Sequence, residues 1–363
     1  MLTLGGWLHT LDPFLWRISG DLGVRWYGMA YIAGFVVAWI TLWALAKRGR
    51  ILIRPEQVTD LIFAIVLGVL LGGRLGYVLI YQPSLLWTFE ASPPWWGVLA
   101  IHKGGMASHG GMIGVAVACI WYARRVNVPA LHLMDMLALV APVGVFFGRL
   151  ANFVNGELLG KIVAAPGEKA PDWSVRFPQE LRDPDLRLLL YTDDQHDALA
   201  FALERVALPG DNHAVAIERL IREVQRGSAE AAASIEPLLT ARHPSQLYQA
   251  FAEGVVVLVV LCAVWMKPRR PGVVSAWFLM TYGAGRIFTE LYRLPDAHLR
   301  VPRPMGLTYG QWLSVAMITI GALLLAWIIA NKGKTQPIGG WRARNTPPPG
   351  TDPGTDPVAD PGD

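Results

Sequence analysis

Seven long apolar runs constrain what this chain can fold into more than any other feature. A run of roughly 17–25 apolar residues is long enough to cross a bilayer as a helix. Of all residues, 53% are hydrophobic and only 17% are charged, whereas a soluble domain has about 25% charged residues. We therefore predict an all-α polytopic membrane protein with seven transmembrane helices. The runs occupy residues 27–46, 59–82, 108–123, 131–154, 247–266, 272–292 and 309–331.

The basic residues of the short loops predict an orientation. Lysine and arginine are enriched in cytoplasmic loops, and here they follow the first, third, fifth and seventh runs, at residues 47–50, 124–125, 267–270 and 332–334. If the spans alternate, all four sites face one side of the membrane. The N-terminus then lies outside and the C-terminus in the cytoplasm. The net charge of +4 reflects these loops and does not indicate nucleic-acid binding.

The stretches between and around the runs predict the organisation of the chain. Within the first 26 residues, Phe14, Leu15, Ile18 and Leu22 are spaced to share one face of an amphipathic helix. The polar insert between spans four and five has helical periodicity over 197–207 and 213–225. We expect an N-terminal interfacial segment (1–26), transmembrane helices 1–4 (27–160), a small extracytoplasmic lobe (161–243), transmembrane helices 5–7 (244–331) and a disordered cytoplasmic tail rich in Pro, Gly and Asp (332–363).

The two cysteines, Cys119 and Cys262, both lie inside predicted spans. They form no CxxC pattern and have no neighbouring pair of histidines, so neither a metal site nor a disulfide framework is indicated. We interpret them as small packing residues.

Polar groups gather at the predicted outer end of the fourth span. The apolar run there ends in Arg149, Asn152, Asn155 and Glu157, within nine positions. Charged groups this close to a span are costly, and they usually face a protein interior or a wet cavity where they have a function. This segment is therefore where we expect the chemistry of the chain.

A second polar group lies on the sixth span. Tyr282, Arg286, Glu290 and Arg293 are spaced by 4, 4 and 3 residues, which places them on one face of a helix. Because such a stripe is unfavourable against lipid, we expect it to face inward.

Two further residues should lie at the same depth. Tyr27 begins the first span, and His109 stands among glycines at the start of the third. Arginine suits bidentate binding of phosphate, and histidine exchanges a proton near neutral pH. If these groups converge, they indicate an enzyme that acts on an anionic phospholipid by a proton-coupled transfer.

Two other classes of protein are alternatives. A transporter of an anionic solute would line its pathway with Arg and His, but the chain has no convincing internal repeat and its polar clusters all lie at outer span ends. A non-catalytic lipid-binding or scaffolding protein would not need a histidine, two arginines and two glutamates gathered together.

Six motifs resemble those of the bacterial phosphatidylglycerol–prolipoprotein diacylglyceryl transferases. In the family's order they are residues 25–28, 73–77, 109–114, 148–160, 242–248 and 282–293. The resemblance implies that the diacylglyceryl group of phosphatidylglycerol moves to the lipobox cysteine thiol of a preprolipoprotein, that a thioether forms and that glycerol 1-phosphate leaves. It also implies a bacterial cytoplasmic (inner) membrane location, an active site near the outer face, and no metal or cofactor. We expect a monomer, and a role of the insert in docking the preprolipoprotein is a hypothesis.

The resemblance also assigns functional positions. They are Tyr27, His109, Arg149, Asn152, Glu157, Gly160, Tyr282, Arg286 and Glu290. We interpret Arg149 and Arg286 as a clamp on the lipid phosphate that stabilises charge on the leaving group. The alternative is a pair of structural ion pairs, Arg149 with Glu157 and Arg286 with Glu290. Glu157 either only holds an arginine or also handles a proton.

The remaining roles keep their alternatives. His109 is a base for the thiol, a positioning residue or a packing residue, and Arg286 is an alternative source of thiol activation. Asn152 and Asn155 bond either the lipid headgroup or the last carbonyls of the span; we favour the headgroup for Asn152 and capping for Asn155.

Tyr27 and Tyr282 bind the headgroup or anchor at the interface, while Gly156 and Gly160 permit the turn out of the membrane. Arg74 supports the site or a second lipid site. Residues 243–248 are a helix start or a substrate contact.

Overall fold

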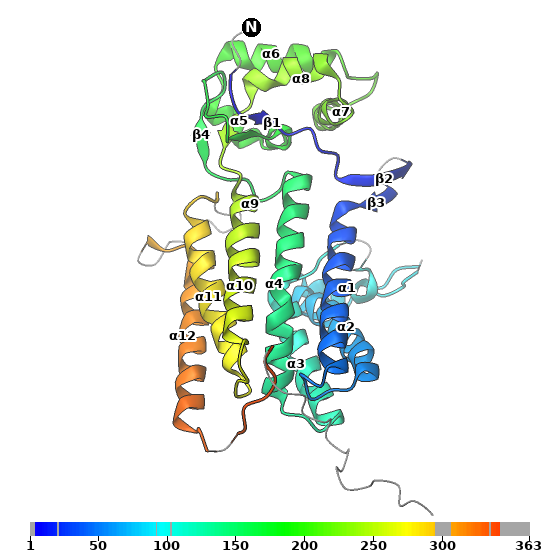
Figure 1. Ribbon diagram of the computed structural model, residues 1–363. Helices are drawn as coiled ribbons and strands as arrows, with labels where there is room; N and C mark the ends of the chain where they lie inside the picture. Colours follow the sequence, from blue (N-terminus) through cyan, green and yellow to red (C-terminus); the bar gives the residue numbers. More distant parts are fainter. Residues whose placement is uncertain are drawn as a thin grey trace, which may run out of the picture. The chain divides into compact units, whose positions relative to one another are not determined.

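Helices dominate the computed structural model, which describes residues 4–19, 22–91, 93–101, 104–294, 306–333 and 335–341. Helical segments occur at all seven predicted runs (Figure 1). They are α1 (Trp26–Lys47), α2 (Pro55–Ile80), α3 (Ser108–Arg125), α4 (Ala130–Asn155), the continuous stretch α9 (Ser245–Gln249), η6 (Ala250–Val256) and α10 (Val257–Val264), then α11 (Val273–Glu290) and α12 (Tyr309–Ala330).

Five of the described helical segments are long and apolar enough to cross a membrane. They are residues 26–47, 55–80, 130–155, 245–264 and 310–330. The two others, α3 and α11, are shorter and contain the polar residues of the motifs. The predicted membrane character is therefore confirmed.

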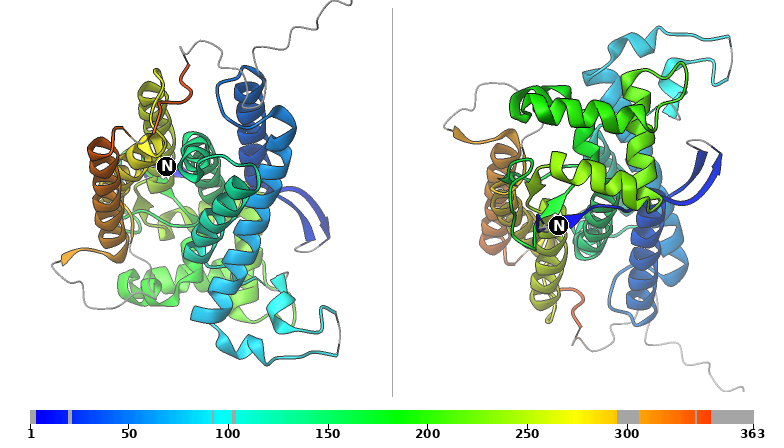
Figure 2. Two further views of the ribbon diagram at one scale, coloured as in Figure 1. Left: turned by 90° about the horizontal axis from the view of Figure 1, so that it is seen from below. Right: turned by 90° about the horizontal axis from the view of Figure 1, so that it is seen from above.

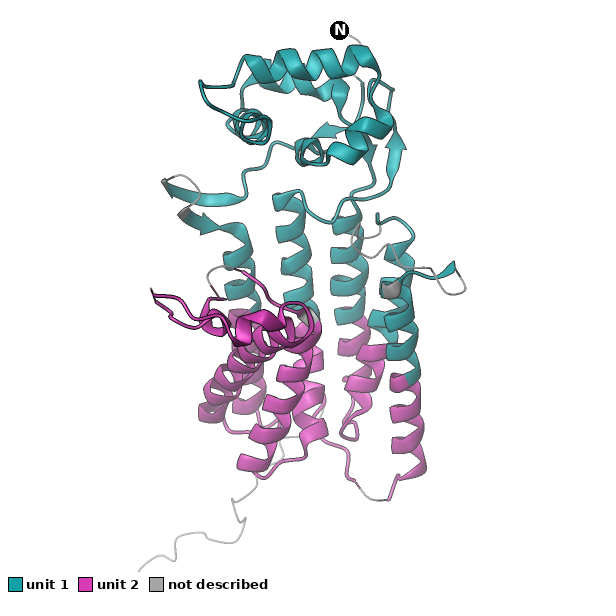
Figure 3. Cartoon of the chain, turned by 180° about the vertical axis from the view of Figure 1, so that it is seen from behind, with its two compact units in different colours: residues 1–34, 142–258, 280–319 teal, residues 35–141, 259–279, 320–363 magenta. Residues whose placement is uncertain are grey.

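The contacts within the chain divide it into two compact units (Figure 3). Unit 1 comprises residues 1–34, 142–258 and 280–319, and unit 2 comprises residues 35–141, 259–279 and 320–363.

The polar insert forms a lobe with its own core in unit 1. Its helices are α5 (Pro184–Leu190), α6 (Asp193–Glu204), α7 (His213–Gln225) and α8 (Ala229–Ile235). The two helices predicted at 197–207 and 213–225 are thus confirmed as α6 and α7. Both begin at capping side chains, since Thr192 accepts a hydrogen bond from Gln195 N and Asn212 from Val215 N. Their buried faces meet in a core that includes Leu199, Leu203, Ile217, Leu220, Ile221 and Val224.

The all-α prediction is incomplete, because the lobe also contains a four-stranded sheet. Its order is β1 (Trp7–Leu8), β5 (Val175–Arg176), β6 (Ala241–Arg242) and β4 (Ile162–Ala164). Strands of two or three residues are too short to show a period of two in the sequence. The sheet also joins the N-terminal segment to the lobe, since β1 pairs with β5.

The amphipathic helix expected in the N-terminal segment is wrong. Residues there form an antiparallel hairpin of β2 (Phe14–Ser19) and β3 (Leu22–Arg25), which leads into α1 (Figure 2). The guanidinium carbons of Arg17 and Arg25 lie 4.0 and 4.4 Å from the centre of the Phe14 ring. The Arg25 contact follows from the pairing of the two strands, in which Phe14 stands opposite Arg25. The dipeptide Gly20-Asp21 is typical of a two-residue hairpin turn, and this signal competes with the helical spacing.

Close glycine packing joins α2 to α3 in unit 2. A Cβ atom at Gly68 would lie 2.6 Å from the carbonyl oxygen of Gly114, and one at Gly76 would lie 2.8 Å from Cα of Gly110. Small residues at intervals of four let two membrane helices approach closely. The glycines that follow His109 therefore pack against another helix.

The disordered tail is predicted to begin at residue 332, but residues 335–341 pack within unit 2. Ile338 N donates to Arg269 O at 2.7 Å, and the Trp341 ring packs edge-on against Trp265 with 4.8 Å between ring centres. These two apolar residues give the segment 335–341 enough surface to pack within unit 2. Residues 342–363 of the predicted tail lie outside the described residues.

Candidate functional site

Two arginines from different helices meet at one carboxylate in unit 1. Arg149 on α4 places Nη2 2.9 Å from Oε2 of Glu253, and Arg286 on α11 places Nη1 3.5 Å from Oε1 of the same residue. Glu253 is fully buried and lies in the π-helical stretch η6. Such π-helical turns occur frequently at functional sites.

Further polar groups extend this arginine–carboxylate cluster. Thr289 Oγ1 donates to Glu253 Oε1 at 2.8 Å. Glu290 Oε2 lies 3.1 Å from Arg286 Nη2 and 3.7 Å from Arg293 Nη1, and its Oε1 accepts from Thr308 Oγ1 at 3.2 Å. Glu290 therefore contacts two arginines, as Glu253 does.

The predicted stripe on the sixth span is largely brought together. Tyr282 hydrogen-bonds Arg149 through its hydroxyl, and the Arg286–Glu290 pair has the expected helical spacing. Arg293 lies beyond the end of α11 but still reaches Glu290. Three guanidinium groups thus contact the two carboxylates Glu253 and Glu290. Guanidinium groups gathered in this way suit the binding of an anion.

Glu157 does not pair with Arg149, so this part of the alternative interpretation, a structural ion pair between the two residues, is wrong. Its carboxylate instead accepts from Asn152 Nδ2 at 3.2 Å and from Asn155 Nδ2 at 3.3 Å. The reason is geometric: α4 ends at Asn155, and Gly156 at φ +64° turns the chain back so that Glu157 faces the two asparagines. Asn155 hence contacts a side chain at the helix end.

Gly160 permits a close approach of two backbone segments. Its φ is not positive, but a Cβ atom there would collide with the carbonyl oxygen of His243. Gly160 also forms a bridge with Arg293, whose side chain belongs to the cluster. The turn after α4 is therefore tied to the segment after α11.

The motif at 242–248 holds this same turn. Ser245 Oγ donates to Leu158 O at 3.0 Å, Gln246 Nε2 to Glu157 O at 2.5 Å, and Arg242 Nη1 to Gly160 O at 3.0 Å. Of the two alternatives for this motif, the helix start is observed, because α9 begins at Ser245. Its polar side chains in addition fix the backbone that positions Glu157.

Tyr27 lies in the first turn of α1 in unit 1. It is half-buried, and its ring centre is 5.3 Å from that of Tyr31. Tyr31 lies within electrostatic range of both Arg149 and Glu157, so this pair of tyrosines belongs to the same region of unit 1.

His109 lies in unit 2, at the second residue of α3, and its side chain is exposed. The approach of His109 to the arginines of unit 1 therefore stays a prediction.

Arg74 is a buried clamp on backbone carbonyls. Its Nε donates to Val98 O at 2.7 Å, its Nη1 to Gly104 O and Gly105 O at 2.6 and 2.9 Å, and its Nη2 to Gly97 O at 2.7 Å. Four of its five N–H groups are thus used within unit 2. This favours the supporting role over a second lipid site, and the loop it holds leads into α3.

Glu253 is the residue of this cluster that the sequence interpretation missed. It is a single carboxylate inside the apolar run 247–266, and the cost of a charge at membrane depth applies to it as it does to Arg149. The position of this carboxylate within an apolar run is a signal of function, but Glu253 belongs to no helical stripe and to none of the six motifs.

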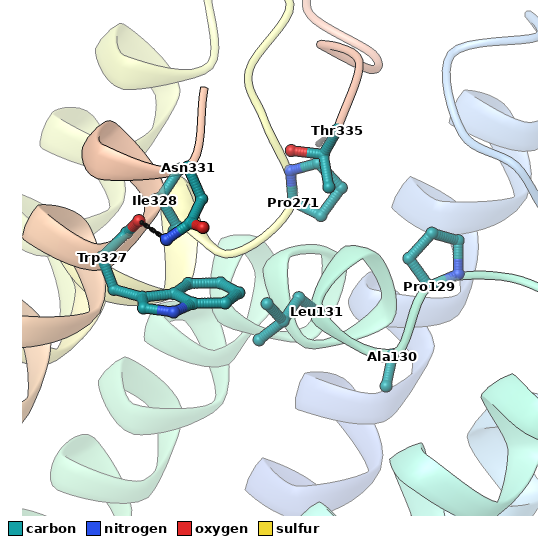
Figure 4. Close-up of a pocket in the computed structure, with 8 residues that line it drawn as sticks. All are labelled: Pro129, Ala130, Leu131, Pro271, Trp327, Ile328, Asn331 and Thr335. Atoms are coloured by element: carbon teal, nitrogen blue, oxygen red, sulfur yellow. Dashed lines mark hydrogen bonds between the residues drawn. The ribbon is translucent and has the colours of Figure 1, made fainter. Parts of the chain in front are cut away.

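A cavity of 230 Å³ in unit 2 carries no such chemistry (Figure 4). Its eight lining residues, which come from around the start of α4, the loop before α11 and the end of α12, include no acid, base or guanidinium group.

Apolar membrane-length helices and a buried arginine–carboxylate cluster define a helical membrane protein with a site suited to an anionic group. The family described as prolipoprotein diacylglyceryl transferase matches residues 13–327. A phosphatidylglycerol–prolipoprotein diacylglyceryl transferase of Bdellovibrio bacteriovorus is 40% identical over 353 residues, covering 92% of this chain and 97% of the relative. Relatives of the same name from Xanthomonas euvesicatoria and Xanthomonas axonopodis are 37% and 36% identical over 321 residues, covering 88% of this chain and 92% of each relative.

The chain therefore belongs to the prolipoprotein diacylglyceryl transferase family. This confirms the resemblance drawn from the six motifs.

Proposed function

We propose that this chain transfers the diacylglyceryl group of phosphatidylglycerol to the cysteine thiol of a preprolipoprotein, the first step of lipoprotein maturation. The sulfur bonds to the glycerol carbon that carried the phosphate, the bond from that carbon to the phosphate oxygen breaks, and glycerol 1-phosphate leaves. The thiol proton passes to a base. The names of the relatives support this reaction, and the observation that carries it is the meeting of Arg149 and Arg286 at one buried carboxylate.

Arg149 and Arg286 bind the lipid phosphate in this proposal. A phosphodiester carries a single negative charge, and the phosphomonoester that leaves carries more, so negative charge grows as the carbon–oxygen bond breaks. Guanidinium groups already held by Glu253 and Glu290 stabilise that charge without having to reorganise. Their side chains keep 18% and 14% of their surface exposed, which leaves N–H groups for bidentate contacts.

The thiol must lose its proton to become a nucleophile. His109 is the proposed base, and its exposed position at the start of α3 supports this role. Lowering of the thiol pKa by Arg286 is the alternative. Glu157, held by two asparagines, does not neutralise an arginine, which supports a role toward the substrate.

The other predicted residues are proposed to position the lipid headgroup. Asn152, Tyr27 and Tyr282 supply hydrogen-bonding groups, and Asn155 contributes through its contact with Glu157. Gly160 keeps the loop close to residue 243.

We further propose that α3 and α11 complete seven spans in the inner membrane. The N-terminus and the lobe then face outward, the C-terminus faces the cytoplasm, and the active site lies near the outer face. The enzyme acts as a monomer without a cofactor.

The test uses purified protein in phosphatidylglycerol vesicles with a lipobox peptide. We expect the peptide to gain the mass of a diacylglyceryl group and an equal amount of glycerol phosphate to appear. A peptide with serine in place of the cysteine should gain nothing. If the cysteine peptide gains no mass and no glycerol phosphate is released, the proposal is wrong.

The clamp has its own test in Arg286→Lys. Because lysine cannot make the planar bidentate contact, we expect kcat/KM to fall at least about tenfold, or about 1.4 kcal/mol. Full turnover by this variant would contradict bidentate binding.

A further inference from the structure

The start of α12 lies against the Arg286–Glu290 pair in unit 1. A Cβ atom at Gly310 would lie 3.4 Å from Glu290 Oε1 and 3.6 Å from Arg286 Nη2. One turn further along, α12 packs closely on α11, since a Cβ atom at Gly283 would lie 2.9 Å from Ser314 O (Figure 1). The first turn of α12 is therefore held beside the arginine–carboxylate cluster, although no residue of this turn has a role in the proposed function.

Thr308 precedes α12 and caps it through a capping box. Thr308 Oγ1 accepts a hydrogen bond from Gln311 N at 3.2 Å, and Gln311 Oε1 accepts one from Thr308 N at 2.9 Å. These reciprocal bonds satisfy N–H groups at the helix start and hold the threonine side chain in place. The same hydroxyl donates its proton to Glu290 Oε1 at 3.2 Å. Because the oxygen accepts one bond and donates the other, the cap directs the bond to Glu290.

A second capping box of the same two residue types shows that this bond is not needed for capping. Thr192 and Gln195 cap α6 in the lobe through the same pair of hydrogen bonds, at 3.3 and 3.0 Å. The hydrogen bonds among the described residues link Thr192 to no carboxylate. The contact between Thr308 and Glu290 is therefore additional to the cap.

This contact orients the Glu290 carboxylate. Oε1 bonds Thr308, while Oε2 lies 3.1 Å from Arg286 Nη2 and 3.7 Å from Arg293 Nη1. Oε2 accepts no hydrogen bond within the described part of the chain, so its contacts with the two guanidinium groups are ion pairs, which depend less on direction than hydrogen bonds do. The directional restraint on this carboxylate is therefore the bond from Thr308.

The second carboxylate of the cluster is held in the same manner. Glu253 Oε1 accepts from Thr289 Oγ1 at 2.8 Å, while its Oε2 lies 2.9 Å from Arg149 Nη2. Arg286 lies between the two carboxylates, with Nη1 3.5 Å from Glu253 Oε1 and Nη2 3.1 Å from Glu290 Oε2. When both carboxylates are fixed, the plane of this guanidinium group is fixed as well.

We propose that Thr308 is a positioning residue of the transfer reaction, which acts through Glu290 to hold the Arg286 guanidinium in the plane that binds the lipid phosphate. The inference rests on the proposed function. Negative charge grows on the phosphate as the leaving group departs, and a guanidinium that is already oriented stabilises this charge without reorganising. Loss of the hydroxyl should therefore slow the transfer and leave the binding of the lipobox peptide unchanged.

The test compares two substitutions of Thr308. Thr308→Val removes the hydroxyl and keeps the shape of the side chain, whereas Thr308→Ser keeps the hydroxyl. We expect kcat/KM for phosphatidylglycerol to fall about tenfold in Thr308→Val, with the KM for the lipobox peptide unchanged, and Thr308→Ser to retain most of the activity. The matched control is Thr192→Val, which removes the capping hydroxyl of α6 and should leave kcat/KM unchanged. All rates refer to protein that elutes as a single folded species.

A double-mutant cycle tests whether Thr308 acts through Glu290. In a Glu290→Ala background the group that Thr308 holds is absent, so Thr308→Val should lower the single-turnover rate by less than about twofold. Normal kcat/KM in Thr308→Val, no recovery in Thr308→Ser, or an equal loss with and without Glu290 would overturn the proposal. If the unaltered protein transfers nothing to the peptide, the proposed function is wrong instead.

Discussion

Glu253 is the carboxylate that Arg149 and Arg286 share. Its two oxygens contact Arg149, Arg286 and Thr289, and no part of it is exposed. Removing one partner of a buried ion pair leaves the other charges uncompensated, at a cost of about 3–5 kcal/mol. An exposed pair contributes only about 0–1 kcal/mol.

We therefore expect Glu253→Gln to lower kcat/KM for phosphatidylglycerol by about 100-fold, or about 2.7 kcal/mol. Glu253→Asp should recover part of this loss, because it keeps the charge. The matched control is Glu223→Gln, which removes an exposed pair with Arg226 in the lobe and should leave activity intact. The measurement is glycerol phosphate release by protein that elutes as a single folded species. A normal rate in Glu253→Gln would show that the arginines do not need this anchor.

At the residue scale, sequence predicted most of the cluster but not its centre. Arg286 and Glu290 were predictable because helical spacing alone places them together. Glu253 reaches Arg149 across 104 positions of chain, and no local spacing encodes such a contact. The sequence offered Arg149 only the nearby Glu157 as an alternative ion-pair partner, whereas its partner in the structure is Glu253.

At the scale of elements, the contact of α2 with α3 depends on glycines that differ in how closely they approach. A Cβ atom at Gly110 would collide with the carbonyl oxygen of Gly72, whereas one at Gly111 would lie 3.7 Å from Val69 O, an ordinary contact. The neighbouring glycines of one motif therefore make separable contributions.

Gly110→Ala should destabilise the protein by about 1–3 kcal/mol, the usual cost of overpacking. Gly111→Ala should change stability little, or raise it slightly because alanine favours a helix. Thermal unfolding in detergent compares the two variants. An equal loss in both would mean that the α2–α3 contact is looser than described.

A second element-scale prediction concerns His9, which follows β1. It is fully buried, and its Nε2–H donates to Phe153 O at 2.8 Å, tying the N-terminal segment to α4. Burial lowers the pKa of His9 from its ordinary value of 6.5 to about 4. Between these values the unfolded chain binds a proton that the folded protein does not, so the stabilisation is complete above pH 6.5 and is lost as the pH falls toward 4.

When the pH is lowered from 7 to 5, the free energy of unfolding should fall by about 2 kcal/mol because of the low pKa of His9 in the folded protein. His9→Gln should lose that part of the pH dependence, whereas His213→Gln, at an exposed site in the lobe, should keep it. The measurement is the thermal midpoint of each protein as a function of pH. Parallel curves for the unaltered protein and His9→Gln would contradict a buried neutral imidazole.

At the scale of the whole molecule, the positions of the long helices follow mostly from the length of the apolar runs in the sequence. Every predicted run is helical because roughly twenty apolar residues have few alternatives in a bilayer. The strands are different, since β1 and β5 owe their pairing to segments that lie far apart in sequence. The same holds for Trp341, which packs against Trp265 although it stands in a stretch of tail-like composition. Contacts with distant parts of the chain determine the structure of these regions. The local sequence pattern does not reveal such contacts.

The orientation of the molecule is the remaining prediction at this scale. Basic residues cluster at the loops after the first, third, fifth and seventh helical runs, so these ends should stay in the cytoplasm. A variant with Cys119 and Cys262 replaced by serine serves as the background. Leu188→Cys, 75% exposed on the lobe, should react with a membrane-impermeant maleimide in cells whose outer envelope has been opened. Lys332→Cys, after α12, should react only once the inner membrane is permeabilised. The reverse pattern would place the lobe inside, away from any secreted substrate, and would contradict the proposed topology.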